Sequence, residues 1–227
     1  MQECQPKRVC YNEVMEEKIN FIKQWIGTGS INIFGLPMSG KDTVGMRLAE
    51  ALGAKFLSSG LIIRAVEKDE HKDLTSRGIL VPTEAFYEMV LPYFEREDLK
   101  AYPLVLSSVG RWFGEELKVI ETAKKTEHPL KVVVALNISE VDVTERWEVA
   151  RTTGDRGERS DDNSLEVFKT RIEEFKLKTL PVLMRYQQMG MLVSVQADQT
   201  REQVFQEVVE KIYQYAQAHP NKTPAKS

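Results

Sequence analysis

Cysteine, histidine and long apolar runs are scarce in this chain. Of 227 residues, only 2 are cysteine and 3 are histidine. Cys4 and Cys10 lie in a polar N-terminal stretch with no metal-type or redox-type spacing, so we interpret them as ordinary thiols. No apolar run approaches the roughly 20 residues of a membrane helix, and the N-terminus lacks the apolar middle of a secretory signal. We therefore expect a globular, soluble, cytoplasmic protein with no membrane partner.

An excess of charge of either sign is also missing. The 31 basic residues are nearly balanced by 34 acidic ones, which gives a formal charge of −3. This balance does not favour nucleic acid as a partner, although a polyanionic small ligand needs only local basic clusters. The length and the 42% hydrophobic composition are enough for one well-buried core with insertions.

Apolar runs and helical patterns alternate along the chain. Continuously apolar runs of strand length lie near residues 30, 102, 131 and 191, with a shorter one near 54, as in buried parallel strands. Helical patterns lie at 12–26, 42–52, 61–68, 83–96, 112–124, 141–151, 164–189 and 201–218. This alternation predicts an α/β fold with a doubly wound parallel sheet.

Three segments fall outside the alternation. Residues 1–11 are predicted to be a loose tail, so 1–29 comprises this tail and an amphipathic helix, and 219–227 is expected to be a flexible tail. Within the main domain, 30–218, two helices occupy 60–98 and a charged, glycine-containing segment occupies 152–163. Insertions of this kind in an α/β core are typical of substrate-covering elements.

A glycine-rich turn follows the first predicted strand. Gly35, Gly40 and Lys41 fit the phosphate-loop pattern G-x-x-x-x-G-K between a strand and a helix, which is the context that the motif requires. In such a loop, backbone N–H groups and the helix N-terminus surround phosphate oxygens, and the lysine reaches the terminal phosphates. The alternative is a chance match in an ordinary strand-to-helix connection. Asp42 follows the lysine, so any hydroxyl facing Mg²⁺ comes from Thr43.

Several motifs in order resemble the adenylate kinases and related nucleoside monophosphate kinases of the short-lid type. "GLPMSGKDT" is similar to the family loop G-x-P-x-S-G-K-x-T, and "GILVPTE" matches G-x-L-V-P-x-E. "LSSGLIIR", "VLSSVGR", "GERSDDN" and "TLPVLMRY" resemble the motifs that follow in the family. The resemblance spans about residues 30 to 215 and implies a P-loop kinase fold with five parallel strands, a monophosphate-binding insertion at about 60–98 and a short lid at about 152–163.

The resemblance also implies two binding sites. The implied ATP site consists of Gly35, Pro37, Met38, Ser39, Gly40, Lys41, Asp42, Thr43 and Arg151. The implied monophosphate site consists of Ser59, Gly60, Arg64, Leu80, Val81, Ser108, Arg111 and Glu115. Lys41, Arg111, Arg159 and Arg171 are the implied catalytic residues, because phosphoryl transfer needs cations around the transferring group.

Some assignments in the lid stay open. The arginine that stacks on the donor base is Arg151 or Arg146, and we favour Arg151. Asp161 and Asp162 could be metal ligands, but we favour a structural role in which they orient lid arginines and cap the helix near Ser164.

The chain departs from the family pattern at its acids. Leu61 and Ser107 stand where the family carries carboxylates near Mg²⁺, so no metal ligand is assigned beyond Thr43, and Mg²⁺ is expected only as Mg-ATP. Asp42 could compensate for them or repel the donor phosphates. These departures keep open an alternative, a nucleotide-binding protein that has lost efficient catalysis.

Glu115 is a second departure, because the adenylate-specific pattern has glutamine there. An ionised carboxylate only accepts hydrogen bonds, which suits the adjacent donors of guanine better than the mixed edge of adenine. The alternative is that Glu115 turns to solvent and Ser59, with the backbone near Val81, selects adenine.

The sequence thus predicts a monomeric ATP-dependent nucleoside monophosphate kinase. The acceptor is AMP, or GMP if Glu115 reads the base. A P-loop kinase of another small metabolite is a third possibility, and "GILVPTE" argues against it.

Overall fold

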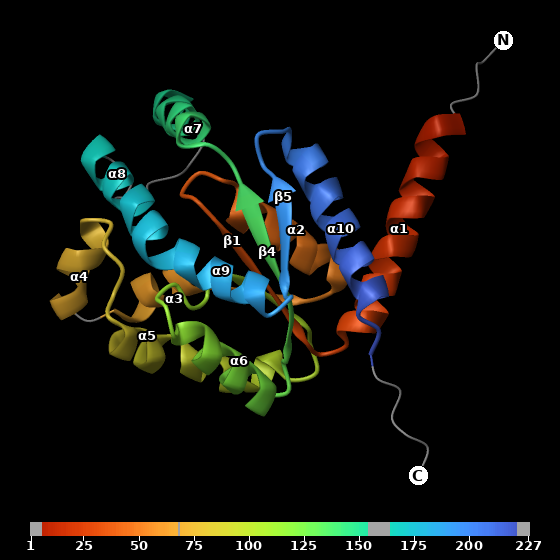
Figure 1. The fold of residues 1–227 in the computed structure, drawn as a ribbon, viewed down its shortest axis with the longest axis horizontal. Helices are drawn as coiled ribbons and strands as arrows, with labels where there is room; N and C mark the ends of the chain where they lie inside the picture. Colours follow the sequence, from red (N-terminus) through yellow and green to blue (C-terminus); the bar gives the residue numbers. More distant parts are fainter. Residues whose placement is uncertain (1–5, 68, 154–163, 222–227) are drawn as a thin grey trace.

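Five apolar segments form a parallel sheet with the strand order β2-β3-β1-β4-β5 (Figure 1). The computed structural model describes residues 6–67, 69–153 and 164–221. The strands are β1 (Ser30–Gly35), β2 (Lys55–Ser58), β3 (Leu104–Ser107), β4 (Leu130–Asn137) and β5 (Leu192–Gln196). Every residue of β1 is buried, because helices cover both faces of a parallel sheet. The predicted fold class is confirmed.

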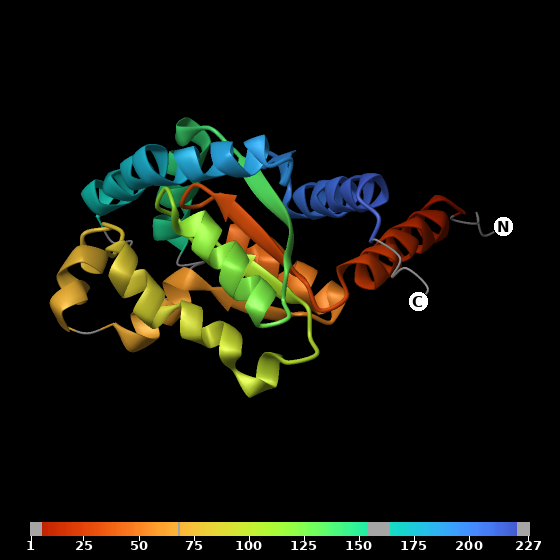
Figure 2. The ribbon, with the colours of Figure 1, turned by 60° about the horizontal axis from the view of Figure 1, so that its bottom comes forward.

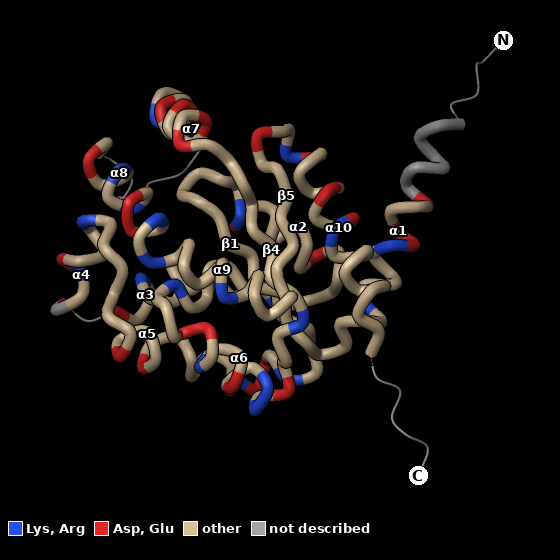
Figure 3. Tube along the Cα trace, in the orientation of Figure 1, with Lys and Arg blue, Asp and Glu red and all other residues tan. Residues whose placement is uncertain are grey.

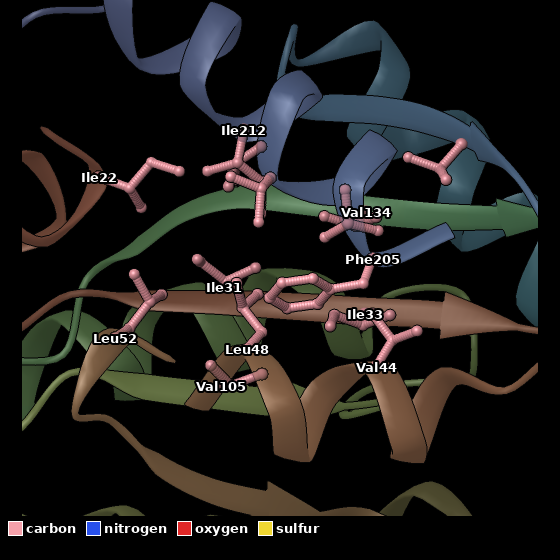
Figure 4. Close-up of a cluster of buried hydrophobic side chains, with 14 of the residues drawn as sticks. Ile22, Ile31, Ile33, Val44, Leu48, Leu52, Val105, Val134, Phe205 and Ile212 are labelled. Carbon is pink, nitrogen blue, oxygen red and sulfur yellow. The ribbon is translucent and has the colours of Figure 1, made fainter. Parts of the chain in front are cut away.

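One face of the sheet is covered by three helices. They are α1 (Pro6–Ile26), α2 (Lys41–Leu52) and α10 (Arg201–Ala218). Ile31 and Ile33 project from β1 into this layer and pack against Leu48 of α2 and Phe205 of α10 (Figure 4). The apolar side chains of this face make up the largest buried cluster of the described chain.

The opposite face carries a second helical layer, seen edge-on in Figure 2. It includes α6 (Glu115–Lys125) and α9 (Leu180–Gln188). Phe34 of β1 lies on this side, and its ring centroid is 6.1 Å from that of Tyr186 in α9. Next to it, α7 (Glu140–Thr153) and α8 (Leu165–Glu174) pack through stacked rings of Trp147 and Phe168.

The insertion between β2 and β3 contains more helices than we predicted. It consists of α3 (Ser59–Val66), α4 (Asp69–Ser76), α5 (Thr83–Met89) and the 3₁₀ turns η1 (Leu91–Glu95) and η2 (Glu97–Leu99). The sequence of α4, "DEHKDLTS", has a single apolar residue, so hydrophobic periodicity could not reveal it. The predicted helix at 83–96 is divided because the chain tightens into a 3₁₀ turn that carries a proline in its first turn.

The long helix predicted at 164–189 is divided by a wide turn. α8 leads into the π-helix η4 (Phe175–Thr179) and then α9. Pro181 lies in the first turn of α9 and has no N–H to donate to the preceding turn, so a wider turn fits this position. The Ser164 hydroxyl caps α8 by accepting a hydrogen bond from Val167 N. The capping role predicted for Asp161 and Asp162 lies outside the described residues.

Both ends of the described chain belong to the folded body. α1 begins at Pro6, within the predicted tail, and its Trp25 Nε1 donates to the carbonyl of His219 at 2.8 Å. The Asn221 side chain donates in turn to Trp25 O at 2.8 Å. Residues 219 and 221, predicted to belong to a flexible tail, thus hold the end of α1. In the part of the chain that the structure describes, no helix has the length and apolarity needed to span a membrane.

Candidate active site

The predicted phosphate loop lies at the centre of the sheet. β1 is flanked by β3 and β4, and ligands of open α/β sheets bind at the carboxyl ends of strands where the strand order reverses. Gly40 has a φ of 86°, which lets the chain turn sharply into α2, and Met38 has a φ of 66°. α2 begins at Lys41, so its first-turn N–H groups, which no helical carbonyl can satisfy, lie at the loop. This geometry suits a phosphate group.

Asp42 is fastened to the end of β3. The Ser107 hydroxyl donates a hydrogen bond of 2.5 Å to Asp42 Oδ1. Ser107 stands where the resemblance implies an acid, and the structure brings the Asp42 carboxylate to that strand end. Leu61, at the other missing acid, is 49% exposed and lines neither cavity of the site.

Two adjoining cavities extend from the phosphate loop toward the insertion. The larger encloses about 650 Å³, including its open mouth, and the smaller about 400 Å³. The larger has an apolar wall formed by Ile63, Ile79, Leu80, Val81, Phe86 and Trp112. The smaller is bounded by Gly35, Pro37 and Lys41 of the phosphate loop. Ser108, Arg111 and Arg171 line both, so the two cavities adjoin between the loop and the apolar wall.

Three arginines from distant segments meet in this space. Arg64 comes from α3, Arg111 from the loop after β3 and Arg171 from α8, and all three line the larger cavity. Figure 3 shows basic segments near α3 and along α8 on the same side of the molecule. Burial lowers the pKa of Arg111 to about 10, and the charges of Arg171 and Arg64 add to this effect. A cluster of cations in a cleft favours an anionic ligand.

Arg111 is held by its own loop. Its Nε donates to Ser108 O at 3.2 Å. The buried Asn32 side chain of β1 bonds both the carbonyl and the N–H of Val109, at 2.8 and 3.3 Å. Ser59 adds a third fastening, because its hydroxyl donates to Ser108 O at 2.6 Å. The central strand and the insertion thereby fix the loop that carries Arg111.

The insertion also contacts α8 at the mouth of the site. Gly78 has a φ of 79°, and a Cβ there would lie 2.7 Å from Cγ of Arg171, so only glycine permits this approach. Leu80 N donates to Glu174 Oε2 at 2.9 Å. Trp112 Nε1 donates to Val81 O at 3.0 Å. These bonds tie the predicted motif residues Leu80 and Val81 to the rest of the site.

Glu115 is buried at the wall of the larger cavity. It is 1% exposed, so the alternative in which it turns to solvent is wrong. Its Oε2 accepts from the backbone N–H of Arg111 at 2.7 Å and from that of Trp112 at 3.0 Å. Burial raises the pKa of Glu115, and the hydrogen bonds to its carboxylate oppose that shift. No described residue makes a hydrogen bond to Oε1.

The structure brings together most, but not all, of the predicted residues. Arg151 is exposed and stacks on Trp147, with its Cζ 4.7 Å from the ring centroid. The alternative, Arg146, touches the phosphate loop through a 3.5 Å bond to Met38 O, so its position suits the donor site better. Thr43 is exposed on α2. Arg159, Asp161, Asp162 and Asn163 lie outside the described residues.

Several residues that line the cavities were not among the site residues predicted from the sequence. Phe86 and Trp112 line the larger cavity, and Glu174 and Thr179 line the smaller. Thr179 stood in the quoted "TLPVLMRY" motif, and its place in the π-helix η4 brings it to the cavity. Phe86 and Trp112 read as helix-core residues, and no local signal assigned them to a ligand.

The fold, the phosphate loop and the arginine-lined cavities define a P-loop kinase. Residues 34–169 match the family described as "AAA domain", and because the match covers more than half of the chain, the chain belongs to that family.

Similar proteins of known name agree with this class. The adenylate kinase of Thermus thermophilus is 29% identical over 182 residues, which cover 78% of this chain and 92% of the relative. The adenylate kinase of Chlamydia caviae is 24% identical over 202 residues, covering 78% and 94%. A gluconokinase from Sinorhizobium meliloti 1021 superposes with a TM-score of 0.59 at 23% identity over 84% of this chain and 95% of that chain, which shows a shared fold alone.

Proposed function

We propose that the protein is an ATP-dependent nucleoside monophosphate kinase that transfers the γ-phosphoryl group of ATP to a nucleoside monophosphate. The observation that carries the proposal is the pair of adjoining cavities between Lys41 and the apolar wall. Arg111 and Arg171 line both cavities, and Arg64 lines the larger. A nucleoside monophosphate suits both parts of this site. Its phosphate can bind the arginines, and its base can pack against the wall of Val81, Phe86 and Trp112.

Each basic residue has a role that follows from its position. Lys41 and the start of α2 hold the β- and γ-phosphates of ATP. Arg64 and Arg111 bind the acceptor phosphate. Arg171 lines both cavities and is therefore placed to neutralise the group in transit. Because arginine stays charged and offers a planar fork of donors, it suits phosphate at every stage of the transfer.

Mg²⁺ is expected to arrive bound to ATP and to neutralise charge on its phosphates. The oxygen donors beside the loop fit this ion, because magnesium prefers carboxylate and hydroxyl oxygens. Asp42, held by Ser107, and Thr43 are the residues that would contact the ion or its water shell. The described residues contain no cluster of three metal-binding side chains.

We expect in-line transfer between the two substrates without a covalent intermediate. Among the described residues, those that line the cavities include arginine, lysine and glutamate but no cysteine or histidine. The work of these residues is to position two nucleotides, to surround the phosphoryl group with cations and to limit water.

The alternative acceptor class is a small non-nucleotide metabolite, as the name of the gluconokinase with the same fold suggests. Catalytic impairment is the other alternative. Against the first, the larger cavity offers an aromatic and aliphatic wall that suits a base better than a polyhydroxylated acid.

A coupled assay of ADP production tests the proposal with AMP, GMP, CMP, UMP and gluconate as acceptors. We expect turnover with at least one monophosphate and none with gluconate. ATP binding without turnover on any monophosphate would contradict the proposal. Lys41→Ala should reduce kcat by at least about a hundredfold at unchanged fold, because it removes the cation on the donor phosphates. Lys118→Ala, on the exposed face of α6 and paired with Glu121, is the matched control.

A further inference from the structure

The carboxylate of Glu115 has two oxygens in different states. Oε2 is saturated by the two backbone donors at Arg111 and Trp112, which fix the side chain in place. Oε1 is also buried, but no described residue donates a hydrogen bond to it. A buried acceptor without a donor is costly, since it has lost its water and gained nothing in exchange. Such an atom at the wall of a ligand cavity indicates that the ligand supplies the missing donor.

The side chains next to Glu115 do not supply a donor for Oε1. The hydroxyl of Thr83, at the start of α5, is close enough to lower the pKa of Glu115 but does not reach Oε1 with hydrogen-bond geometry. The phenols of Tyr87 and Tyr186 lie in the field of the same carboxylate, and their pKa values are raised by burial and by that charge. Neither phenol donates to Oε1, which has no hydrogen-bond partner among the described residues, so a ligand can supply the donor.

The pairing edges of guanine and adenine differ in how well they fit a single hydrogen-bond acceptor. Guanine presents N–H groups at N1 and at its exocyclic nitrogen, and an oxygen with two lone pairs can receive both. Adenine presents one amino group beside N1, which is an acceptor and faces the carboxylate unfavourably. Because Oε2 is already engaged, the discrimination depends on Oε1 alone.

We propose that Glu115 determines the base preference of the acceptor site and that, through Oε1, it favours guanylate over adenylate. The inference rests on the proposed function, since it names the acceptor of the same site. It sets this chain apart from the adenylate kinases to which it is similar. The residue acts by contact with the base, whereas the arginines bind the phosphate.

The isosteric change Glu115→Gln tests this inference sharply. The backbone donors at Arg111 and Trp112 require an oxygen, so the amide oxygen takes the place of Oε2 and the NH₂ group takes the place of Oε1. The atom in the place of Oε1, on a residue that lines the larger cavity, thereby changes from acceptor to donor at nearly constant shape. A donor at this position matches adenine N1 and opposes guanine N1–H.

The measurement is kcat/KM for GMP, IMP and AMP with saturating Mg-ATP, together with calorimetric Kd values for each monophosphate. We expect the wild type to use GMP best and AMP least, with IMP between them because it keeps N1–H and lacks the exocyclic amino group. In Glu115→Gln the ratio of GMP to AMP should fall by at least about tenfold. Thr83→Val is the matched control, and its ratio should stay within about twofold of wild type because Thr83 does not reach Oε1.

The possible failures are distinguishable. If no monophosphate is phosphorylated, the proposed function is wrong. If monophosphates are phosphorylated but Glu115→Gln leaves the ratio unchanged, or if the wild type uses AMP as well as or better than GMP, only the assignment of Glu115 is overturned. An equal shift in Thr83→Val would also overturn it. Should Glu115→Gln fold poorly, the calorimetric order of GMP, IMP and AMP on the wild type decides: AMP binding as tightly as GMP contradicts the inference.

Discussion

Two arginines of the same insertion differ in what they face. Arg64 lines the larger cavity, whereas the Arg77 side chain is 64% exposed and pairs with Asp73 one turn earlier. An exposed pair of this kind contributes little to stability or binding. We therefore expect an arginine of the insertion to contribute to binding only where it can contact the ligand. Comparing Arg64 with Arg77 tests this difference.

We predict that Arg64→Ala raises the KM for the monophosphate by about tenfold to a hundredfold, because a charge-assisted hydrogen bond to phosphate contributes roughly 1.5–3 kcal/mol. The KM for ATP should change little. Arg77→Ala should leave both values unchanged. Steady-state kinetics with each substrate varied in turn measures this, and an Arg64→Ala enzyme with wild-type KM for the monophosphate would contradict the assignment.

The raised pKa of Glu115 predicts a pH-dependent stability. Burial disfavours the charged form in the native state, so the native carboxyl binds its proton at higher pH than the unfolded one, whose value is near 4.5. Stability from this group is therefore present below the unfolded pKa and is lost as the pH rises through the native pKa. Glu115→Gln removes the charge and should raise Tm relative to wild type at pH 7.5, with the gain vanishing near pH 4.

Thermal melts of the two proteins at both pH values measure the effect. Glu84→Gln, at an exposed carboxylate in the first turn of α5, provides the control and should show no such pH-dependent gain. The Tm difference between Glu115→Gln and wild type could instead be more negative at pH 7.5 than at pH 4. That result would mean that the backbone hydrogen bonds to the carboxylate outweigh the cost of burying its charge.

Some residues of the site could be read from the sequence and others could not. Gly40, Lys41 and Arg111 belong to contiguous motifs whose chemistry is local, so the loop and its neighbours were predictable. The pairing of Asp42 with Ser107 joins residues 65 positions apart in the chain, and only the fold brings them together. Sequence reasoning likewise named Glu115 but could not decide whether it faced solvent, because burial depends on how α6 packs.

At the scale of elements, α10 has the most complete start signal of the described helices. The Thr200 hydroxyl accepts from Gln203 N at 3.3 Å, and the Gln203 side chain accepts from Thr200 N at 3.2 Å, which is a capping box. The predicted bounds of this helix, 201–218, agree with those of α10. α4 has one apolar residue in its sequence and was missed, and the π-helix η4 depends on how Pro181 is accommodated, which hydrophobic periodicity does not register.

We predict that Thr200→Ala lowers the free energy of unfolding by about 1 kcal/mol, because the backbone N–H of Gln203 loses its acceptor. The monophosphate and ATP KM values should not change, since α10 lies on the face away from the cavities. Thr170→Ala, within α8, is the control, because its hydroxyl only bonds the Glu166 carbonyl of its own helix. Urea denaturation measures the free energy of unfolding of both variants. Equal losses would show that the Thr200 cap contributes no more than a hydroxyl within a helix.

At the scale of the whole molecule, stability and the site are placed on different faces of the sheet. α1, α2 and α10 lie together on one face (Figure 1) and bury the largest apolar cluster of the described chain. The larger cavity is lined by residues of the insertion, α8 and the loop after β3. α1 lies outside the region of the resemblance, yet its Ile22 is fully buried and Trp25 is 6% exposed. The first helix is therefore part of the core rather than an appendage.

This separation predicts a stability change without a functional one. Ile22→Ala should lower the free energy of unfolding by roughly 2–5 kcal/mol, because it opens a cavity between α1, α10 and β1. Gln24→Ala, on the exposed face of the same helix, should change it by less than about 0.5 kcal/mol. At a temperature where both variants are folded, the KM values for ATP and the monophosphate should match wild type. A loss of substrate affinity in folded Ile22→Ala would show instead that α1 communicates with the site through β1, because that strand carries both Ile31 in the core and Gly35 at the phosphate loop.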